Sequence, residues 1–483
     1  MRVVLVSPLT LDAYSDPFLG EPIGMLYVAA AAEAAGHEVW VLDQVDPRYR
    51  AARNMVAEAV RLNPDVLGFT ATTAAFPLAL RIAEAVRART DCRVVAGGIH
   101  VTHAPEAVLE HRAIDFAVLG EGEQTFVGLL AALVAGRAFT DVPGLAFRDE
   151  RGRLARTPDR ARLDDLDALP QPLRRGLPVA QRRIHGLLDV WPLGRRFVSV
   201  STSRGCPYQC IFCAPPHPGQ PRWTARSAAS VLEEIDVLRT DGPVDFVLFT
   251  DPTFTHRAER VEEIASGLRR HHPALRWGCE VRAPDVTPRL AAVMAGAGCV
   301  FAGVGIESGT DAALERIRKH AVLADMRRAL AALVDAEIQV HGNVIIGFPW
   351  EDRADLEACL EVYRTLPMDV FGINYAVPFP GTALHRQAVD EELIVDADLA
   401  HWTTRRPVMR TRHLSLDQLE EYYGRMSRSY YLRPGYGALV ARRIRSRPRR
   451  VFSYALTALT GVAMGRFSKG WRRRSGRSPL VGL

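Results

Sequence analysis

Cysteine is scarce in this 483-residue chain, and its distribution excludes one class of protein. A small secreted domain held together by disulfides would spread an even number of cysteines through a short chain. Here there are seven, and three of them lie within eight positions. We also expect no secretory leader, because the N-terminal apolar run, residues 1–8, is too short and no small-residue cleavage site follows it. We therefore expect a protein of the reducing cytoplasm.

Long apolar runs and a balanced charge distribution are lacking as well. No run reaches the roughly 20 apolar residues needed to cross a bilayer. Residues 437–483 contain twelve Lys or Arg and no Asp or Glu, which leaves 49 basic and 55 acidic residues elsewhere, a net of −6 against +6 for the whole chain. The basic character therefore belongs to the tail. Gly, Pro and total charge are near average, so the body is expected to be globular, and its length implies two or three domains.

The first 145 residues alternate short apolar strands with helical patterns. About five such units predict a parallel sheet covered on both faces, in a doubly wound, flavodoxin-like α/β domain. Residues 146–195 are rich in Arg, Asp and Pro, show weak periodicity, and are interpreted as a connector. The expected strands are 3–6, 38–42, 66–69, 93–96 and 116–119, and the expected helices are 23–33, 54–62, 78–89, 104–111 and 123–134.

A second strand–helix series occupies residues 196–395. Six units predict a partial (β/α)6 barrel, since a full barrel would need two more. Residues 396–483 are expected to be mainly helical, with an amphipathic helix at 415–428 that Pro434-Gly435 ends. The expected barrel strands are 197–201, 246–249, 275–280, 301–306, 339–346 and 370–377, with helices at 228–240, 259–271, 288–296, 311–317, 325–336 and 353–366.

Cys206, Cys210 and Cys213 follow the first strand of this second series with Cys-x3-Cys-x2-Cys spacing. Three thiolates at this spacing can bind three irons of a four-iron cluster, which leaves the fourth iron open to an external ligand. A zinc site completed by His217 is the alternative, but zinc sites normally use two Cys-x2-Cys pairs and only one is present. The remaining Cys279, Cys299 and Cys359 lie in strand or helix patterns and are expected to be buried small hydrophobes.

The run Arg204-Gly205-Cys206-Pro207 through Phe212-Cys213 resembles the signature of the radical S-adenosylmethionine superfamily. Similar motifs follow in order at 249–254, 280–283, 305–309, 342–351 and 378–382. The resemblance implies that S-adenosylmethionine chelates the open iron and that one electron cleaves it to a 5′-deoxyadenosyl radical. It further implies an external electron donor, flavodoxin or ferredoxin. The residues expected to bind S-adenosylmethionine are Phe212, Asp251, Arg282, Glu307, Ser308 and Gly347.

Three of these residues have competing interpretations. Asp251 and Glu307 follow strands, at the end where barrel enzymes place functional groups. For both residues the alternative is helix capping. Arg282 is expected to pair with the methionine carboxylate, and the alternative is a surface ion pair.

The loops of the first domain are similar to those of the cobalamin-binding domain in the class B radical methylase group. The similarity lies in Gly97-Gly98-x-His100 and in Gly120-Glu121-Gly122-Glu123, at strand ends where doubly wound domains bind ligands. The Asp-x-His-x-x-Gly motif of other cobalamin proteins is absent, so we expect no His ligand on cobalt, with His100 near the corrin but not beneath it. The implied cobalamin-binding residues are Pro22, Gly24, Thr70, Thr72, Thr73, Gly97, Gly98, His100, Gly120, Glu121 and Gly122.

The resemblance implies a cobalamin-dependent enzyme that methylates an unactivated carbon of a small or lipophilic metabolite. A ring-forming oxidation or rearrangement, as in the anaerobic porphyrin cyclases, would use the same parts. A tRNA methylthiotransferase would carry three more cluster cysteines near the N-terminus, where only Cys92 lies. A non-enzymatic cobalamin sensor would not need the intact cysteine motif.

The tail contains an uncharged run, residues 451–465, between two clusters of Arg and Lys. Fifteen residues are too few to span a bilayer but enough to lie in its interface, where flanking Arg would attract anionic headgroups. The alternatives are a core helix with a solvated basic end, and a nucleic-acid site, which few aromatics and an acidic body argue against. The C-terminal part also resembles relatives acting on hopanoids and porphyrin esters. We therefore expect a cytoplasmic enzyme without a nucleic-acid partner, whose tail contacts the inner face of the membrane.

Overall fold

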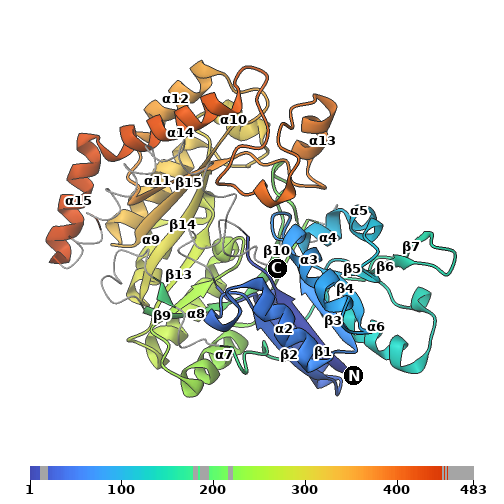
Figure 1. Ribbon diagram of the computed structural model, residues 1–483. Coiled ribbons are helices and arrows are strands. Elements are labelled where there is room, and N and C mark those ends of the chain that lie inside the picture. Colours follow the sequence, from blue (N-terminus) through green and yellow to red (C-terminus); the bar gives the residue numbers. More distant parts are fainter. Residues whose placement is uncertain are drawn as a thin grey trace.

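The computed structural model describes residues 1–10, 20–177, 183–184, 195–215, 221–448, 451 and 454. Within these ranges the chain forms two α/β bodies, each built on a seven-stranded sheet, that lie side by side (Figure 1). Helices follow the second body toward the C-terminus. The predicted order of a doubly wound domain, a partial barrel and a helical region is confirmed.

The first sheet has the strand order β2-β1-β3-β4-β5-β6-β7, and its first five strands are parallel. In β1, Val4 and Val6 belong to the core on one face, while Val3 and Leu5 belong to the core on the other. This two-sided burial explains the continuous apolar strand sequence. The strands are β1 (Arg2–Ser7), β2 (Glu38–Asp43), β3 (Val66–Thr70), β4 (Arg93–Gly97) and β5 (Phe116–Val118), with helices α1 (Ile23–Ala34), α2 (Ala52–Leu62), α3 (Phe76–Arg87), α4 (Ile99–His103), α5 (Pro105–Glu110) and α6 (Glu123–Ala135).

The first sheet continues past residue 145, where we expected the connector to begin. Strands β6 (Leu145–Arg148) and β7 (Leu154–Arg156) add an antiparallel hairpin beside β5. A turn with Gly152 at φ +74° joins them, and the Asp149 carboxylate accepts hydrogen bonds from the backbone N–H groups of Arg151 and Arg153. Charged residues in the turn interrupt the apolar pattern here, so the pattern did not predict this hairpin.

The second sheet has the order β16-β15-β14-β13-β12-β9-β8, with six parallel strands and the antiparallel β8 at one edge. This is the predicted six-unit partial barrel. Its large core includes the fully buried Trp277. The strands are β8 (Arg183–Ile184), β9 (Arg195–Val200), β12 (Phe246–Phe249), β13 (Arg276–Val281), β14 (Cys299–Glu307), β15 (Gln339–Ile346) and β16 (Val370–Tyr375), with helices α7 (Ala228–Asp241), α8 (Ala258–His271), α9 (Pro288–Gly296), α10 (Asp311–Arg316), α11 (Leu323–Asp335) and α12 (Arg353–Tyr363).

The C-terminal helices are α13 (Ala383–Asp390), α14 (Leu416–Tyr431) and α15 (Pro434–Ser446). Pro434 ends the α14 pattern as predicted and starts α15 as its first residue, where its missing N–H costs nothing. Arg443 of α15 is fully buried and forms an ion pair with Asp369 at 2.8 Å. The start of the basic tail is therefore a packed helix. Apart from Val451 and Tyr454, the uncharged run 451–465 lies outside the described residues.

Candidate functional site

The cysteine motif lies in a loop between the barrel and the first domain. Strand β10 (Ser203–Cys206) pairs with β11 (Arg222–Ala225) in a short antiparallel hairpin that carries this loop. Cys206, Cys210 and Cys213 are free thiols. Desolvation first, and then the neighbouring thiols Cys210 and Cys206, raise the pKa of Cys213 to about 11. The three sulfurs are therefore close enough to influence one another.

These thiols suit a cluster of several irons better than a single ion. No group of three or more His, Cys, Asp or Glu side chains in the described ranges is arranged to hold one metal ion. Each thiolate of an iron–sulfur cluster binds a different iron, so such a cluster keeps its ligands farther apart than zinc does. His217, the fourth ligand of the zinc alternative, lies outside the described residues. The remaining cysteines, Cys279, Cys299 and Cys359, are buried as expected.

Arg282 contacts the cysteine loop directly. Its guanidinium lies over the ring of Tyr208, with Cζ 3.7 Å from the ring centroid, and Tyr208 lies between Cys206 and Cys210. The same guanidinium donates to the backbone carbonyl of Lys319 at 2.8 Å and to that of His320. Arg282 also forms an ion pair with Asp285 at 4.0 Å, and this pair is largely buried because the two side chains are only 9% and 18% exposed. Arg282 joins the cysteine loop to the segment after α10, and its role toward a methionine carboxylate remains a prediction.

Glu307 ends β14 at a point where the register with β15 shifts. Its φ of +64° is unusual for a residue with a side chain, and such outliers cluster at functional sites. Its carboxylate pairs with Lys319 at 2.7 Å, both side chains being nearly buried. Gly305 leaves room for this pair, because a Cβ there would lie 2.4 Å from the Glu307 oxygen. Ser308, also buried, has its hydroxyl 3.6 Å from the Cys359 sulfur.

Asp251 is fully buried beneath the cysteine loop. Its carboxylate accepts hydrogen bonds from the backbone N–H of Thr202 at 2.7 Å and of Ser203 at 3.0 Å, and from the Thr202 hydroxyl. Desolvation raises its pKa even though these bonds favour the charged form. The described contacts of Asp251 thus fix the strand that leads into Cys206. They differ from a helix cap, and a contact between Asp251 and S-adenosylmethionine stays a prediction.

Gly347 and Phe212 lie near the end of β15. Gly347 has φ +94° and donates its N–H to Glu351 at 2.6 Å, and Phe348 donates to the same oxygen at 3.0 Å. The Phe212 ring is 6.1 Å from that of Phe348. Phe212 thereby connects the last cysteine of the motif to this turn.

A cavity of about 410 Å³ lies between the two bodies and is lined by residues of both. Gly98 at its wall has φ +98°, and a Cβ there would come within 2.9 Å of Thr70 and Ala71, so only glycine fits. The first domain contributes seven predicted cobalamin-binding residues to the lining, Gly24, Thr70, Gly97, Gly98, Gly120, Glu121 and Gly122. The barrel contributes Ser201, Ser203, Arg204, Gly205, Thr250 and Pro252.

The other four predicted cobalamin-binding residues do not line this cavity. His100 is buried, bonds Thr73 through Nδ1 at 3.2 Å and packs on Phe76 with ring centroids 4.7 Å apart. Burial lowers the pKa of His100 to about 4, so it is neutral at pH 7. Thr72 and Pro22 accept helix-starting N–H groups through their backbone carbonyls. His100 therefore does not line this cavity, and its place near a corrin stays a prediction.

The sequence did not reveal the residues that join the two bodies. His103 at the end of α4 bonds the backbone carbonyl of Pro215, two residues after Cys213, through Nε2 at 2.7 Å. Arg204 pairs with Glu123 at 2.6 Å. The sequence also did not indicate Lys319, the partner of Glu307, as a site residue. Arg204 and Glu123 each belong to a motif that the sequence identified, but no local pattern connects the two residues of any of these contacts.

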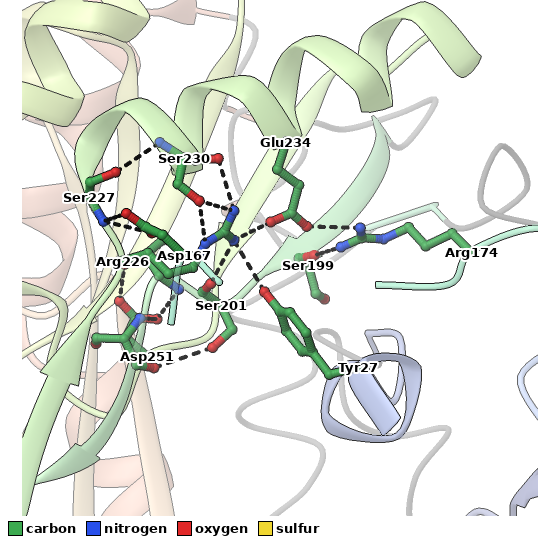
Figure 2. A network of polar contacts seen from close by, with 12 residues as sticks. Tyr27, Asp167, Arg174, Ser199, Ser201, Arg226, Ser227, Ser230, Glu234 and Asp251 are labelled. Carbon is green, nitrogen blue, oxygen red and sulfur yellow. Dashed lines mark hydrogen bonds and ion pairs between the residues drawn. The ribbon is translucent and has the colours of Figure 1, made fainter. Parts of the chain in front are cut away.

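A buried polar network continues along the interface (Figure 2). Tyr27 of α1 accepts a hydrogen bond from Arg226 at 3.2 Å. Glu234 of α7 lies between Arg226 and Arg174, which it contacts at 2.8 Å. Arg174 of the connector also donates to the backbone carbonyl of Ser199 at 2.7 Å. The network therefore ties the first domain, the connector and the barrel together beside the cavity.

Comparison with protein families gives matches to both bodies. Residues 13–130 match the B12 binding domain, and residues 200–362 match the Radical SAM superfamily. An uncharacterized methyltransferase of Pyrococcus horikoshii, PH0819, is 31% identical over 440 residues, which cover 90% of this chain and 93% of that protein. An anaerobic magnesium-protoporphyrin IX monomethyl ester cyclase of Rubrivivax gelatinosus is 25% identical over 402 residues, which cover 80% of this chain and 70% of the cyclase.

Among solved structures, the methyltransferase TsrM of Kitasatospora setae shares the fold across the whole chain. Its complex with tryptophan and an S-adenosylmethionine analogue gives a TM-score of 0.67 at 19% identity, covering 98% of this chain and 99% of TsrM. A TsrM structure with cobalamin and a [4Fe-4S] cluster gives 0.65 at 23% identity, covering 81% and 75%. The fold of this chain is thus one that is already known from solved structures.

Proposed function

Because the chain belongs to the cobalamin-binding radical S-adenosylmethionine family, we propose that it methylates an unactivated carbon of a small or lipophilic metabolite. The family's cofactors are a 4Fe-4S cluster, S-adenosylmethionine and cobalamin. When bound, they supply one-electron chemistry and a transferable methyl group. The observation that carries the proposal is the cavity shared by the glycine-rich loops and the strand leading into Cys206.

The residues present fit these groups. Three free thiols in one loop suit the cluster. Gly98 allows a large ligand to approach the backbone, and the cavity wall holds two buried oxygens without a hydrogen-bond partner, Glu123 Oε2 and Ser203 Oγ. Amide groups of a corrinoid could donate to them.

Other side chains position the loop that holds the cluster. Asp251 holds the strand before Cys206, Arg282 holds Tyr208 inside the loop, and Phe212 packs near Phe348. The Glu307–Lys319 pair places opposite charges near Cys210, where both act on the pKa of its thiol. We assign these residues to orienting S-adenosylmethionine at the open iron.

The direct test is anaerobic reconstitution with iron, sulfide and a chemical reductant. The wild-type chain should form 5′-deoxyadenosine from S-adenosylmethionine, and Cys213→Ala should not. Equal behaviour of the two proteins would contradict the assignment. A supply of flavodoxin or ferredoxin in place of the chemical reductant tests the proposed protein electron donor.

The acceptor is best found by comparing metabolites of a deletion strain with those of its parent, using methyl-labelled methionine. A missing labelled compound would identify a methylation product. A missing unlabelled ring product would instead favour the cyclase alternative, which is the reaction named for the Rubrivivax relative. The compound in that name is a porphyrin ester, which also supports a lipophilic substrate for this chain.

Contact between the basic tail and a membrane belongs to the same proposal. No helix in the described ranges is long and apolar enough to cross a bilayer. Residues 449–483 contain eight Lys or Arg and no Asp or Glu, which would favour anionic lipid. Flotation with anionic liposomes should recover the full chain and lose it when residues 449–483 are removed. Equal recovery of both would exclude this contact.

A further inference from the structure

The acidic loop before α6 binds an arginine of the barrel across the cavity. Arg204 contacts Glu123 at 2.6 Å and Glu121 at 3.9 Å, and it lies over the ring of Tyr27 at 4.9 Å. The side chains of Arg204, Glu123 and Glu121 are only 16%, 4% and 11% exposed. Water therefore screens this attraction little, and loss of one partner would leave a buried charge uncompensated.

Arg204 is firmly connected to the cysteine loop. It lies in β10, two residues before Cys206, and is opposite Thr224 in the β10–β11 hairpin. Gly205, between them, has φ +76°, and a Cβ there would lie 2.2 Å from the Arg222 carbonyl oxygen. Because the backbone is this tightly packed, a displacement of Arg204 must also displace Cys206.

The carboxylates of Glu121 and Glu123 also lie at the cavity that is expected to hold the corrinoid. Gly120, Glu121, Gly122 and Glu123 all line the cavity. One oxygen of Glu123 accepts from Arg204, while the other, Oε2, is buried without a partner. A corrinoid amide that donated to this oxygen would pull on the same carboxylate that holds Arg204.

We propose that Glu123, assisted by Glu121, is a positioning residue that couples occupancy of the corrinoid pocket to the arrangement of the cysteine loop through Arg204. The inference needs the family's cofactors but not the proposed methyl acceptor. Coupling of this kind is reciprocal: if the cluster tightens cobalamin binding, cobalamin stabilises the cluster-binding arrangement by the same factor.

The test measures cobalamin affinity of the purified full chain by absorbance titration, with and without the reconstituted cluster. In the wild type, the cluster should tighten cobalamin binding about 5-fold or more, the lower range of measured couplings. Glu123→Gln keeps the size of the side chain and removes its charge. In this variant the ratio of the cobalamin affinity with the cluster to that without it should fall close to unity. The electron paramagnetic resonance spectrum of the reduced cluster should likewise change on cobalamin addition in the wild type but not in the variant.

Glu33→Gln is the matched control. It removes the same charge from an ion pair with Arg175 of the connector, whose side chains are 37% and 73% exposed, and it should keep the wild-type ratio. If Glu123→Gln does not fold, Arg204→Lys replaces it, and its ratio should also fall because the planar two-pronged contact is lost.

The proposal is overturned if the cluster has no effect on cobalamin affinity in the wild type, or if the folded variant keeps the wild-type ratio. Neither titration measures methyl transfer. A failure of the proposed methylation would therefore leave this result unchanged, and a failed coupling would leave the methylation unchanged.

Discussion

At the scale of single residues, Glu307 and Lys319 form an ion pair that water hardly reaches. Desolvation acts to lower the pKa of the Lys319 ammonium, but the carboxylate of Glu307 at 2.7 Å reverses this and the pKa is raised. Glu307→Gln should lower the free energy of unfolding by about 3 kcal/mol, as for other buried pairs that lose one partner. Urea unfolding measures the change, and Glu315→Gln on the exposed face of α10 should change it little. Similar values for both variants would contradict the pairing.

Glu351 gives the stability of the protein a dependence on pH. Burial raises its pKa to about 8, against an ordinary value of 4.5 and in spite of hydrogen bonds from Gly347 and Phe348. The folded chain therefore keeps a proton that the unfolded chain releases, so this group favours folding most below pH 4.5 and progressively less as the pH rises toward 8. Glu351→Gln keeps the acceptor oxygen and cannot ionise.

We expect unfolding free energies of Glu351→Gln to vary less with pH than those of the wild type, measured between about pH 5 and pH 8. The exposed Glu361→Gln on α12 should keep the wild-type slope. An unchanged slope in Glu351→Gln would show that the carboxyl ionises normally in the folded protein.

At the scale of elements, the β4–α4 turn determines the shape of the corrinoid pocket. Gly98 and Gly136 both have positive φ, but a Cβ would collide with Thr70 and Ala71 at Gly98 and would meet nothing within 4 Å at Gly136. Alanine at Gly136 should cost about 1–2 kcal/mol for the left-handed backbone, and alanine at Gly98 should cost more because its Cβ also collides with Thr70 and Ala71. Only Gly98→Ala should also lose cobalamin uptake, measured by absorbance after gel filtration. Equal uptake by both variants would place the corrinoid elsewhere.

The elements themselves were largely predictable, because apolar strands and Gly or Pro breaks are local signals. Every predicted strand was found in order, and α7 was predicted as 228–240 against an observed Ala228–Asp241. The β6–β7 hairpin was missed since its strands are only four and three residues long and its turn is charged. Asp251 was placed correctly at a strand end, but which group its carboxylate binds depends on the loop at Thr202 and Ser203, which no periodicity describes.

At the scale of the whole molecule, the contacts that set the two bodies against each other were beyond prediction. Arg204 and Glu123 are 81 residues apart, and Arg226 and Tyr27 are 199 apart. Such pairs leave no mark in one sequence, since no local pattern connects residues this far apart in the chain. The cysteine motif and the glycine loops identified the two cofactors, while their mutual placement came only from the fold.

Glu234 tests how strongly this interface joins the bodies. It is fully buried between Arg226 and Arg174, and Arg174 belongs to the connector (Figure 2). Glu234→Gln would leave two guanidinium groups without their shared counter-charge, at a cost of about 3–5 kcal/mol. Because that cost falls on the interface, calorimetry should show two separate unfolding transitions where the wild type shows one. Glu233→Gln, on the exposed face of the same helix, should keep the single transition, and a single transition in both variants would mean that apolar contacts alone hold the domains together.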